Sequence, residues 1–373
     1  MNEQTKTPRQ LGYRMPAEWE PHEATWLAWP HNSVDWPGKF ASIPWLYAEI
    51  VRLLAAREPV HLIVENAAAE KRVRGMLHRA GANLDRVSFH RWPTDRGWTR
   101  DSGPIFVRNS KGQVALTNWR FNAWAKYDDW RLDDKLPGRV AKLLGCPHWQ
   151  PLVQNQNGTK CQDKNGAKRR VVLEGGSIDV NGAGLLLTTE ECLLSEVQQR
   201  NPGLSREQLE SAFEDYLGID QVIWLGRGIV GDDTHGHVDD IARFVARDTM
   251  IAAVEPNTSD PNHAPLAENL ARLKAARTPS GKPFNIVELP MPRAVLFRGQ
   301  RLPASYANFY IANGLVLVPT FHDSNDRVAL NTLAEVFPGR EVIGVHSTDL
   351  IWGLGALHCM TQQQPAGRSP SGI

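Results

Sequence analysis

Cys359 is the residue of this 373-residue chain whose setting most favours covalent chemistry. It follows His358 directly and comes after Gly353 and Gly355, which allow a sharp turn and the close approach of a ligand. A thiol in such a place can act as a nucleophile when its surroundings favour the thiolate, although a single cysteine is often only a small buried apolar residue. The other cysteines have no comparable neighbours, and we expect them to lie outside a site: Cys146, Cys161 and Cys192.

A second group with chemical potential is the segment 235–240 (HGHVDD). His237 and Asp239 are two positions apart, so an extended backbone would turn both side chains toward one pocket, as a general acid/base and a carboxylate. Two other interpretations stay open. One is a turn with a structural histidine. The other is a metal site of His235, His237 and Asp239, whose spacing resembles the H-x-H-x-D-H motif of metallo-hydrolases. Asp240 replaces the last histidine of that motif, which weakens the metal interpretation.

Two more carboxylates, Asp101 and Glu174, each stand beside glycine or proline just before an apolar strand. Several inward carboxylates without a cysteine-rich zinc motif favour a cationic substrate that is rich in hydrogen-bond donors. A guanidinium fits best, because its planar fork of N–H groups matches paired carboxylates. The alternative is that these residues cap loops, as Asp often does, with Arg100 forming a simple surface pair with Asp101.

The elements that would position these residues form a repeat of hairpin, helix and single strand. Strand–turn–strand patterns are predicted at 105–107 with 114–116, 177–180 with 185–187, 242–245 with 250–254, and 308–311 with 315–318. Helical periodicity is found at 44–56, 206–217, 264–276 and 327–337, and single strands are predicted at 59–64, 221–225, 285–289 and 340–345. Residues 353–359 read as a fifth strand, for which the early run 24–29 could supply the partner.

This repeat bears directly on the site, because each chemical cluster stands just before a hairpin. Equivalent strand starts in stacked supersecondary units face a common centre, and such units often close radially. We therefore expect residues that are far apart in the sequence to converge on one site.

Composition excludes several classes of protein. The 42 basic and 41 acidic residues leave a formal charge of +1, so neither nucleic acid nor an anionic membrane is an expected partner. No apolar run approaches the roughly 18 residues of a membrane span, and residues 1–10 show no apolar leader, which together predict a cytoplasmic protein with free thiols. Five of the 13 tryptophans fall in the first 45 positions; they suggest packing around the core, or else a non-catalytic binding module.

The expected domain organisation is a single domain over residues 12–366. The segment 154–170 is polar and rich in Gly, Asn and Lys, and it predicts an inserted surface loop. Residues 1–11 and 367–373 are expected to be flexible tails.

Taken together, the motifs resemble those of the agmatine deiminases, in the bacterial peptidyl-arginine-deiminase-like branch of the guanidino-group-modifying enzymes. The resemblance runs from residues 15–23 (MPAEWEPHE) to 362–365 (QQQP), which is nearly the whole chain. Four motifs carry it in order: 98–104 (WTRDSGP), 173–178 (LEGGSI), 236–239 (GHVD) and 358–363 (HCMTQQ).

The resemblance implies an α/β fold of the pentein type, a five-bladed α/β propeller with pseudo-fivefold repeats. It implies that Cys359 attacks a guanidinium carbon, that His237 acts as general acid/base paired with Glu174, and that Asp101 and Asp239 hold the guanidinium nitrogens. Trp98 and Trp124 are further candidates for substrate contact. It also implies a reaction without metal or organic cofactor on a small guanidine, agmatine first, in the context of polyamine biosynthesis. Family members often form homodimers, so the resemblance raises a homodimer as an expectation.

Three features depart from the family pattern as we expect it. Ala356 and Leu357 precede His358 where Asn-Ile is expected, His235 replaces a common Asp, and the segment 154–170 is an insertion. These departures bear on the substrate more than on the chemistry, and they leave peptidyl-arginine or free arginine as alternative substrates.

Overall fold

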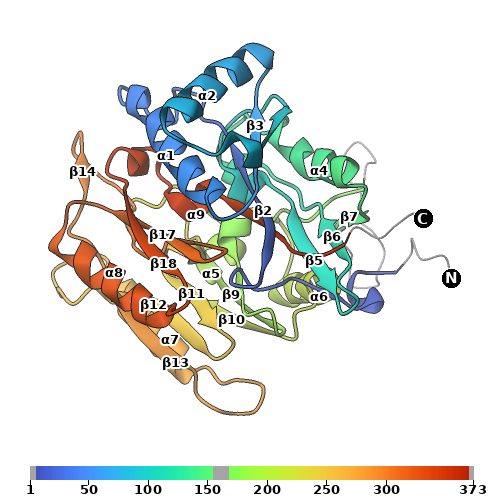
Figure 1. Ribbon diagram of the computed structural model, residues 1–373. Helices are drawn as coiled ribbons and strands as arrows, with labels where there is room; N and C mark the ends of the chain where they lie inside the picture. Colours follow the sequence, from blue (N-terminus) through green and yellow to red (C-terminus); the bar gives the residue numbers. More distant parts are fainter. Residues whose placement is uncertain (1–5, 154–167, 369–373) are drawn as a thin grey trace.

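The computed structural model of the protein describes residues 6–153 and 168–368 (Figure 1). The predicted surface loop 154–170 lies outside these residues except for its last three positions, as does Cys161. The predicted tails also lie partly outside. Within the described part of the first tail, Arg9 pairs with Asp220 at 2.7 Å, which attaches this segment to the folded body.

Five sheets of three or four strands make up the β structure of the described residues. In sheet order they are β19 (Gln362–Pro365), β2 (His22–Ala28), β3 (Val60–Val64) and β4 (Val87–Arg91); β1 (Tyr13–Arg14), β5 (Ile105–Asn109), β6 (Val114–Thr117) and β7 (His148–Trp149); β10 (Gln221–Leu225), β9 (Leu185–Thr189) and β8 (Asp179–Val180); β11 (Ala242–Ala246), β12 (Thr249–Val254) and β13 (Asn285–Pro290); β16 (Tyr310–Ala312), β17 (Leu315–Thr320) and β18 (Glu341–His346). A separate two-stranded ribbon contains β14 (Leu296–Phe297) and β15 (Gln300–Arg301).

Each of the five sheets repeats one pattern, an antiparallel hairpin followed by a parallel strand. The hairpins β5–β6, β8–β9, β11–β12 and β16–β17 are antiparallel, and β7, β10, β13 and β18 then join them in parallel. The four predicted hairpins are therefore confirmed. In the fifth sheet β19 pairs antiparallel with β2, with Gln362 opposite Trp26, so the last strand completes a sheet that starts with strands early in the chain.

The α-helices are α1 (Ile43–Ala55), α2 (Ala67–Arg79), α3 (Thr99–Ser102), α4 (Leu136–Leu144), α5 (Glu190–Leu194), α6 (Arg206–Leu217), α7 (His263–Ala275), α8 (Ser324–Val336) and α9 (Leu357–Met360). Prediction and structure agree at both ends of α6, whereas α1, α7 and α8 begin up to three residues earlier than predicted. The sequence did not predict α2 or α4. The apolar side of α2 is narrow, since its buried hydrophobic residues are only Ala69, Val73 and Leu77.

Helix α6 illustrates how the sequence fixes these elements. Ser205 and Gln208 form a reciprocal capping box at its start, and Gly218 adopts a left-handed conformation (φ 70°) at its end. Leu209, Phe213 and Leu217 recur at intervals of four residues and are fully buried against the sheet. Burial of each such side chain contributes roughly 1.5–3 kcal/mol of hydrophobic stabilisation.

Figure 1 shows the larger helices α1, α2, α4, α7 and α8 at the periphery, with α9 near the middle of the molecule. No helix among the described residues is long and apolar enough to cross a membrane. Each sheet, together with the helices that precede or connect its strands, is called a module below. Four short helical turns from four different modules pack in a row: α9, α3, η7 (Gly175–Ser177) and η8 (Val238–Asp240). The predicted α/β class is confirmed, and the predicted convergence of distant residues is seen in this contact of four turns.

Candidate active site

The thiol of Cys359 lies on the first turn of α9 and is held by Asn308. The sequence predicted a strand here, but Leu354 turns the chain through a left-handed conformation (φ 65°), and residues 357–360 then form a helical turn. The Asn308 side-chain amide donates a hydrogen bond to Sγ at 3.1 Å, and its Oδ1 accepts one from the backbone N–H of His358 at 3.0 Å. Cys359 is 6% exposed, so only one small face of the thiol is open.

The imidazole of His237 is completely buried between two carboxylates. Its Nδ1 lies 3.8 Å from Asp101 Oδ1 and its Nε2 lies 3.7 Å from Glu174 Oε2, while neither ring nitrogen makes a hydrogen bond. Burial alone would lower the pKa of His237, but the negative charge of Asp101 and the contacts with Cys192 and Glu174 raise it well above the usual range. The surrounding negative groups therefore favour the imidazolium form of His237, which can donate a proton.

Glu174 is kept ionised by an arginine that the sequence did not reveal. Arg200 Nε lies 3.1 Å from Glu174 Oε1, and both side chains are fully buried. Burial would raise the pKa of Glu174, but the charges of Arg200 and His237 lower it below its ordinary value. Because Arg200 also donates to the backbone carbonyl of Gln198 at 2.9 Å, the carboxylate has a fixed place beside His237.

Asp101 on α3 is held by two donors from other segments. The backbone N–H of Gly176 donates to Oδ1 at 3.0 Å and the indole N–H of Trp124 donates to Oδ2 at 2.8 Å. Trp124 has a left-handed backbone (φ 58°), as do Ala123 and Ala125 on either side of it. Strain of this kind in non-glycine residues persists where the surrounding structure requires it, commonly at functional sites. Burial is the main cause of the raised pKa of Asp101.

Asp239 shares the space next to the thiol. Its Oδ2 lies 2.6 Å from His358 Nδ1 and 3.8 Å from Cys359 Sγ, whereas its Oδ1 is buried without a hydrogen-bond partner. Burial would raise the pKa of Asp239, but the hydrogen bond and charge of His358 lower it. The free Oδ1 is thus a buried acceptor that an incoming donor would satisfy.

Glu18 connects this site to the rest of the molecule. Its Oε2 contacts His358 Nε2 at 2.7 Å, Arg243 at 2.9 Å and Arg100 at 3.3 Å. Burial opposes ionisation, but these three groups hold the pKa of Glu18 well below its usual range. Arg100 is 2% exposed, so the simple surface pair with Asp101 that the sequence allowed is wrong.

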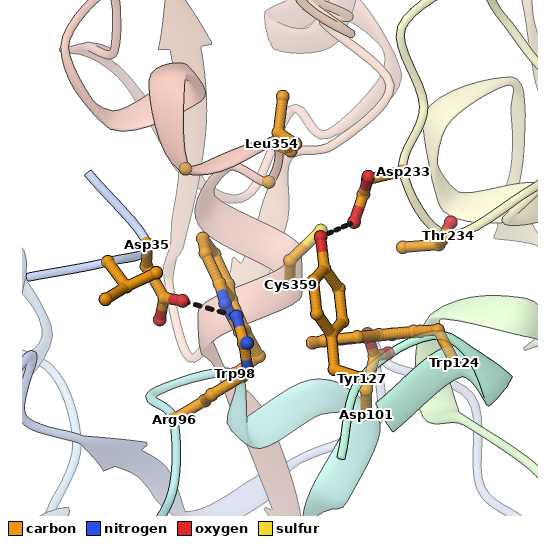
Figure 2. Close-up of a pocket in the computed structure, with 13 residues that line it drawn as sticks. Asp35, Arg96, Trp98, Asp101, Trp124, Tyr127, Asp233, Thr234, Leu354 and Cys359 are labelled. Atoms are coloured by element: carbon orange, nitrogen blue, oxygen red, sulfur yellow. Dashed lines mark hydrogen bonds and ion pairs between the residues drawn. The ribbon is translucent and has the colours of Figure 1, made fainter. Parts of the chain in front are cut away.

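Cys359 and Asp101 line a cavity of about 110 Å³ (Figure 2). Figure 2 shows Cys359 near its centre, with Trp98 on one side and Trp124 and Asp101 on the other. Val34 lines the same cavity and is 71% exposed, so the cavity reaches the surface there. The structure therefore brings Cys359, Asp101, Trp98 and Trp124 to one cavity, with Asp239, His237 and Glu174 packed directly behind it.

The surroundings of the thiol are strongly anionic. Burial is the first cause of a Cys359 pKa well above the usual range, and the negative charges of Asp239, Asp240 and Asp101 add to it. Without a ligand the sulfur is accordingly a neutral thiol, and a cation placed beside these carboxylates would favour the thiolate.

Comparison with known proteins gives this site a family. Residues 14–365 match the family model described as Porphyromonas-type peptidyl-arginine deiminase. The chain belongs to this family. The resemblance predicted from the motifs is thus confirmed.

Several related proteins align with nearly the whole length of this chain. The agmatine deiminase of Stutzerimonas stutzeri (strain A1501) is 36% identical over 385 residues, covering 97% of this chain and 98% of that protein. The solved agmatine deiminase of Enterococcus faecalis has a TM-score of 0.84 at 30% identity, covering 97% and 98% of the two chains. A cysteine-to-serine agmatine deiminase of C. jejuni, solved with substrate bound, has a TM-score of 0.79 at 28% identity, covering 95% and 97%.

In this deiminase-family chain, several residues around the site were not predicted from the sequence. They are Glu18, Arg200, Asn308, His358 as a contact of Asp239, and Cys192. The expectation that Cys192 lies outside the site is wrong, because its Sγ lies within 4.8 Å of ligand atoms of Glu174 and His237. A signal was available at Cys192, since it directly follows a strand and two glutamates, with Thr189 capping its helix.

The predicted metal ligands of the alternative interpretation do not converge. Among the described residues, the one group of metal-binding side chains that come together is Glu174, Cys192 and His237, without His235 or Asp239. His235 has a left-handed backbone (φ 63°) and its Nε2 contacts Ser195 Oγ at 3.3 Å. Its side chain therefore has a different partner from that of His237, although the two residues are only two positions apart.

Proposed function

We propose that this protein hydrolyses agmatine, a guanidine with a primary amine at the other end of a four-carbon chain, to N-carbamoylputrescine and ammonia. The observation that carries the proposal is the unsatisfied buried Oδ1 of Asp239 beside the Cys359 thiol, with Asp101 lining the same cavity. Paired carboxylates next to a nucleophile match the N–H groups of a guanidinium. The named agmatine deiminases among the relatives support the same assignment.

In this proposal Asp101 and Asp239 hold the guanidinium nitrogens and Cys359 attacks the central carbon. The cation offsets the negative charges that raise the thiol pKa, so substrate binding itself promotes the thiolate. The thiol proton passes to solvent or to a neighbouring base, and the new C–S bond gives a tetrahedral adduct.

His237 then supplies the proton that lets ammonia leave. The C–N bond breaks, and the carbon remains bound to Sγ as a covalent thiouronium intermediate. Neutral His237 next takes a proton from water, and the hydroxide adds to the same carbon. The C–S bond then breaks, the remaining hydroxyl proton passes to the departing sulfur to restore the Cys359 thiol, and the ureido product leaves. Glu174 keeps His237 oriented, and it stabilises the protonated form of His237 before ammonia leaves and again after His237 has taken the proton from water.

We propose in addition that the five sheets are five blades of an α/β propeller of the pentein type, around the site, in a single domain over residues 12–366. The repeated pairing of hairpin and parallel strand supports this arrangement. A cytoplasmic location and a homodimer are further expectations from the family resemblance.

The test is an assay of ureido product from agmatine, free arginine and a blocked arginine peptide. We expect turnover of agmatine to exceed that of both arginine substrates, and Cys359→Ser to lose more than about 1000-fold in kcat, because oxygen is a far poorer nucleophile at neutral pH. Cys146→Ser is the matched control, since Cys146 lies in a separate buried cluster.

Each contrary outcome points to a defined alternative. Preference for the peptide would make the protein a peptidyl-arginine deiminase. Activity that Cys359→Ser retains but a chelator removes would favour the metal-dependent hydrolase. Turnover of no guanidine would contradict the proposal.

A further inference from the structure

The cavity extends beyond the groups assigned to the guanidinium. Asp35 and Arg96 line it together with Cys359 and Asp101, and Figure 2 shows them beyond Trp98 as seen from Cys359. The side chain of Asp35 is only 1% exposed, so this carboxylate is shielded from the open surface.

One oxygen of Asp35 is without a partner. Its Oδ1 accepts a hydrogen bond from Arg96 NH1, whereas Oδ2 is buried and makes no hydrogen bond. Arg96 does not neutralise Asp35 fully, because its Nε and NH2 donate to Asp129 at 3.3 and 3.0 Å. Burial is the main cause that raises the pKa of Asp35 to about 6, against the lowering effect of Arg96 and of the Trp98 indole.

The other acidic residue in this part of the cavity is already satisfied. Asp233 Oδ1 accepts from Lys126 Nζ, and its Oδ2 accepts from the Tyr127 hydroxyl at 2.7 Å. Among the described residues that line the cavity, Asp35 is therefore the carboxylate outside the guanidinium set with an oxygen free for a new donor.

The aromatic wall of the cavity suits the alkyl chain of a substrate. Trp98 is 5% and Trp124 is 5% exposed, and both indoles line the cavity with Tyr127. Aromatic faces bury methylene groups favourably and also attract an ammonium group.

We propose that Asp35 receives the terminal ammonium group of the substrate, and that this contact selects a guanidine with an amine tail over one with a carboxylate tail. The inference rests on the proposed function and names the residue that sets its substrate class. A primary ammonium supplies the donor that Oδ2 lacks and a charge that a buried carboxylate requires. The α-carboxylate of free arginine would instead meet the negative charge of Asp35.

The experiment compares two substrates that differ only in the tail. Agmatine and n-butylguanidine share the guanidinium and the four-carbon chain, but n-butylguanidine has no amine. For Asp35→Asn we expect the KM for agmatine to rise roughly 10- to 100-fold with kcat nearly unchanged, the size of one lost charged hydrogen bond. For n-butylguanidine we expect KM and kcat within about twofold of the wild type, because this substrate never uses Asp35.

Asp129→Asn is the matched control. It removes the other carboxylate from Arg96, but its side chain is 42% exposed and does not line the cavity. We expect its KM for agmatine to stay within about twofold of the wild-type value. The wild-type protein provides a measurement that needs no folded variant: kcat/KM for agmatine should exceed that for n-butylguanidine by about tenfold or more.

Several results would overturn the inference. An Asp35→Asn protein with unchanged KM for agmatine, or with equal losses on both substrates, would show that Asp35 has only a structural role. Loss specific to agmatine in Asp233→Asn but not in Asp35→Asn would assign the ammonium to Asp233. If the wild type turns over both substrates equally well, the ammonium has no partner at all. A wild type without activity on either guanidine contradicts the proposed function itself, and the inference falls with it.

Discussion

At the scale of single residues, the geometry of the site depends on a missing side chain at Gly176. A Cβ atom at this position would lie 2.6 Å from His237 Nδ1, 2.8 Å from Asp101 Oδ1 and 3.0 Å from Asp239 Oδ2. Alanine would therefore push apart three groups that the proposed mechanism needs together. We expect Gly176→Ala to lower kcat by about 100-fold, because displacements near 1 Å have effects of this size.

The control for this prediction is Gly339→Ala. No atom lies within 4 Å of a Cβ built on Gly339, and its backbone does not require a glycine conformation. Steady-state kinetics together with thermal unfolding separate the two effects, since overpacking also destabilises by about 1–3 kcal/mol. A Gly176→Ala protein with wild-type kcat would show that the three groups do not need their present spacing.

The sequence identified the residues that carry polar chemistry more readily than the residues that support them. Cys359, His237 and Asp101 stand beside glycines or prolines within dense polar motifs, which single them out. Arg200 and Asn308 lie in ordinary-looking segments, and their importance comes only from partners 26 and 51 positions away. Contacts of this range depend on how the modules pack, which no local pattern encodes.

At the scale of the elements, Glu18 joins segments from several modules in one buried ionic cluster. It binds Arg100 on α3, Arg243 on β11, His358 on α9 and the backbone N–H of Ile311 on β16. We expect Glu18→Gln to lower the free energy of unfolding by about 3–5 kcal/mol, because it leaves buried positive groups without their counter-charge. Urea unfolding at neutral pH measures this loss.

The pH dependence of that loss follows from the lowered pKa of Glu18. A carboxyl group whose pKa is lower in the folded state contributes stability that is complete above the unfolded value of about 4.3 and is lost as the pH falls through the folded value. The difference between wild type and Glu18→Gln should accordingly shrink below about pH 4. Glu341→Gln is the control: its pair with Arg57 is 53% and 45% exposed and is worth at most about 1 kcal/mol. A Glu18→Gln loss as small as the control loss would refute the ionic role of the cluster.

Elements with strong periodic patterns were predictable, and those shaped by their surroundings were not. Helix α6 has a capping box and three buried residues at helical spacing, so both of its ends agree with the prediction. Helix α9 contains four residues only, and just before Cys359 the Asn308 side chain accepts a hydrogen bond from the backbone N–H of His358, while Gly355 packs closely against Trp98. A turn of this length has no periodicity to detect.

At the scale of the whole molecule, the last strand, β19, belongs to the same sheet as the early strands β2, β3 and β4. Strand β19 is completely buried and pairs with β2, while the Trp26 indole donates to Gln364 Oε1 at 2.9 Å. The sequence predicted the repeated pattern and the early run 24–29 as a partner for the last strand, but it placed that strand at 353–359, whereas the strand that pairs with β2 is β19 (Gln362–Pro365). It could not show that the modules share buried charges such as Glu18, because charged residues are usually exposed.

This arrangement predicts that the modules unfold together. Leu209 is fully buried on α6, in a module that supplies Glu174 but not Cys359. Leu209→Ala should lower the free energy of unfolding by about 2–5 kcal/mol. If the chain is one cooperative unit, urea should abolish activity, far-UV dichroism and tryptophan fluorescence at one common midpoint, lowered equally in all three signals. Leu143→Ala, at a position that is 48% exposed on α4, should leave that midpoint nearly unchanged. Separate midpoints for dichroism and activity in Leu209→Ala would mean that one module unfolds alone, and that the site tolerates the loss of a neighbouring module.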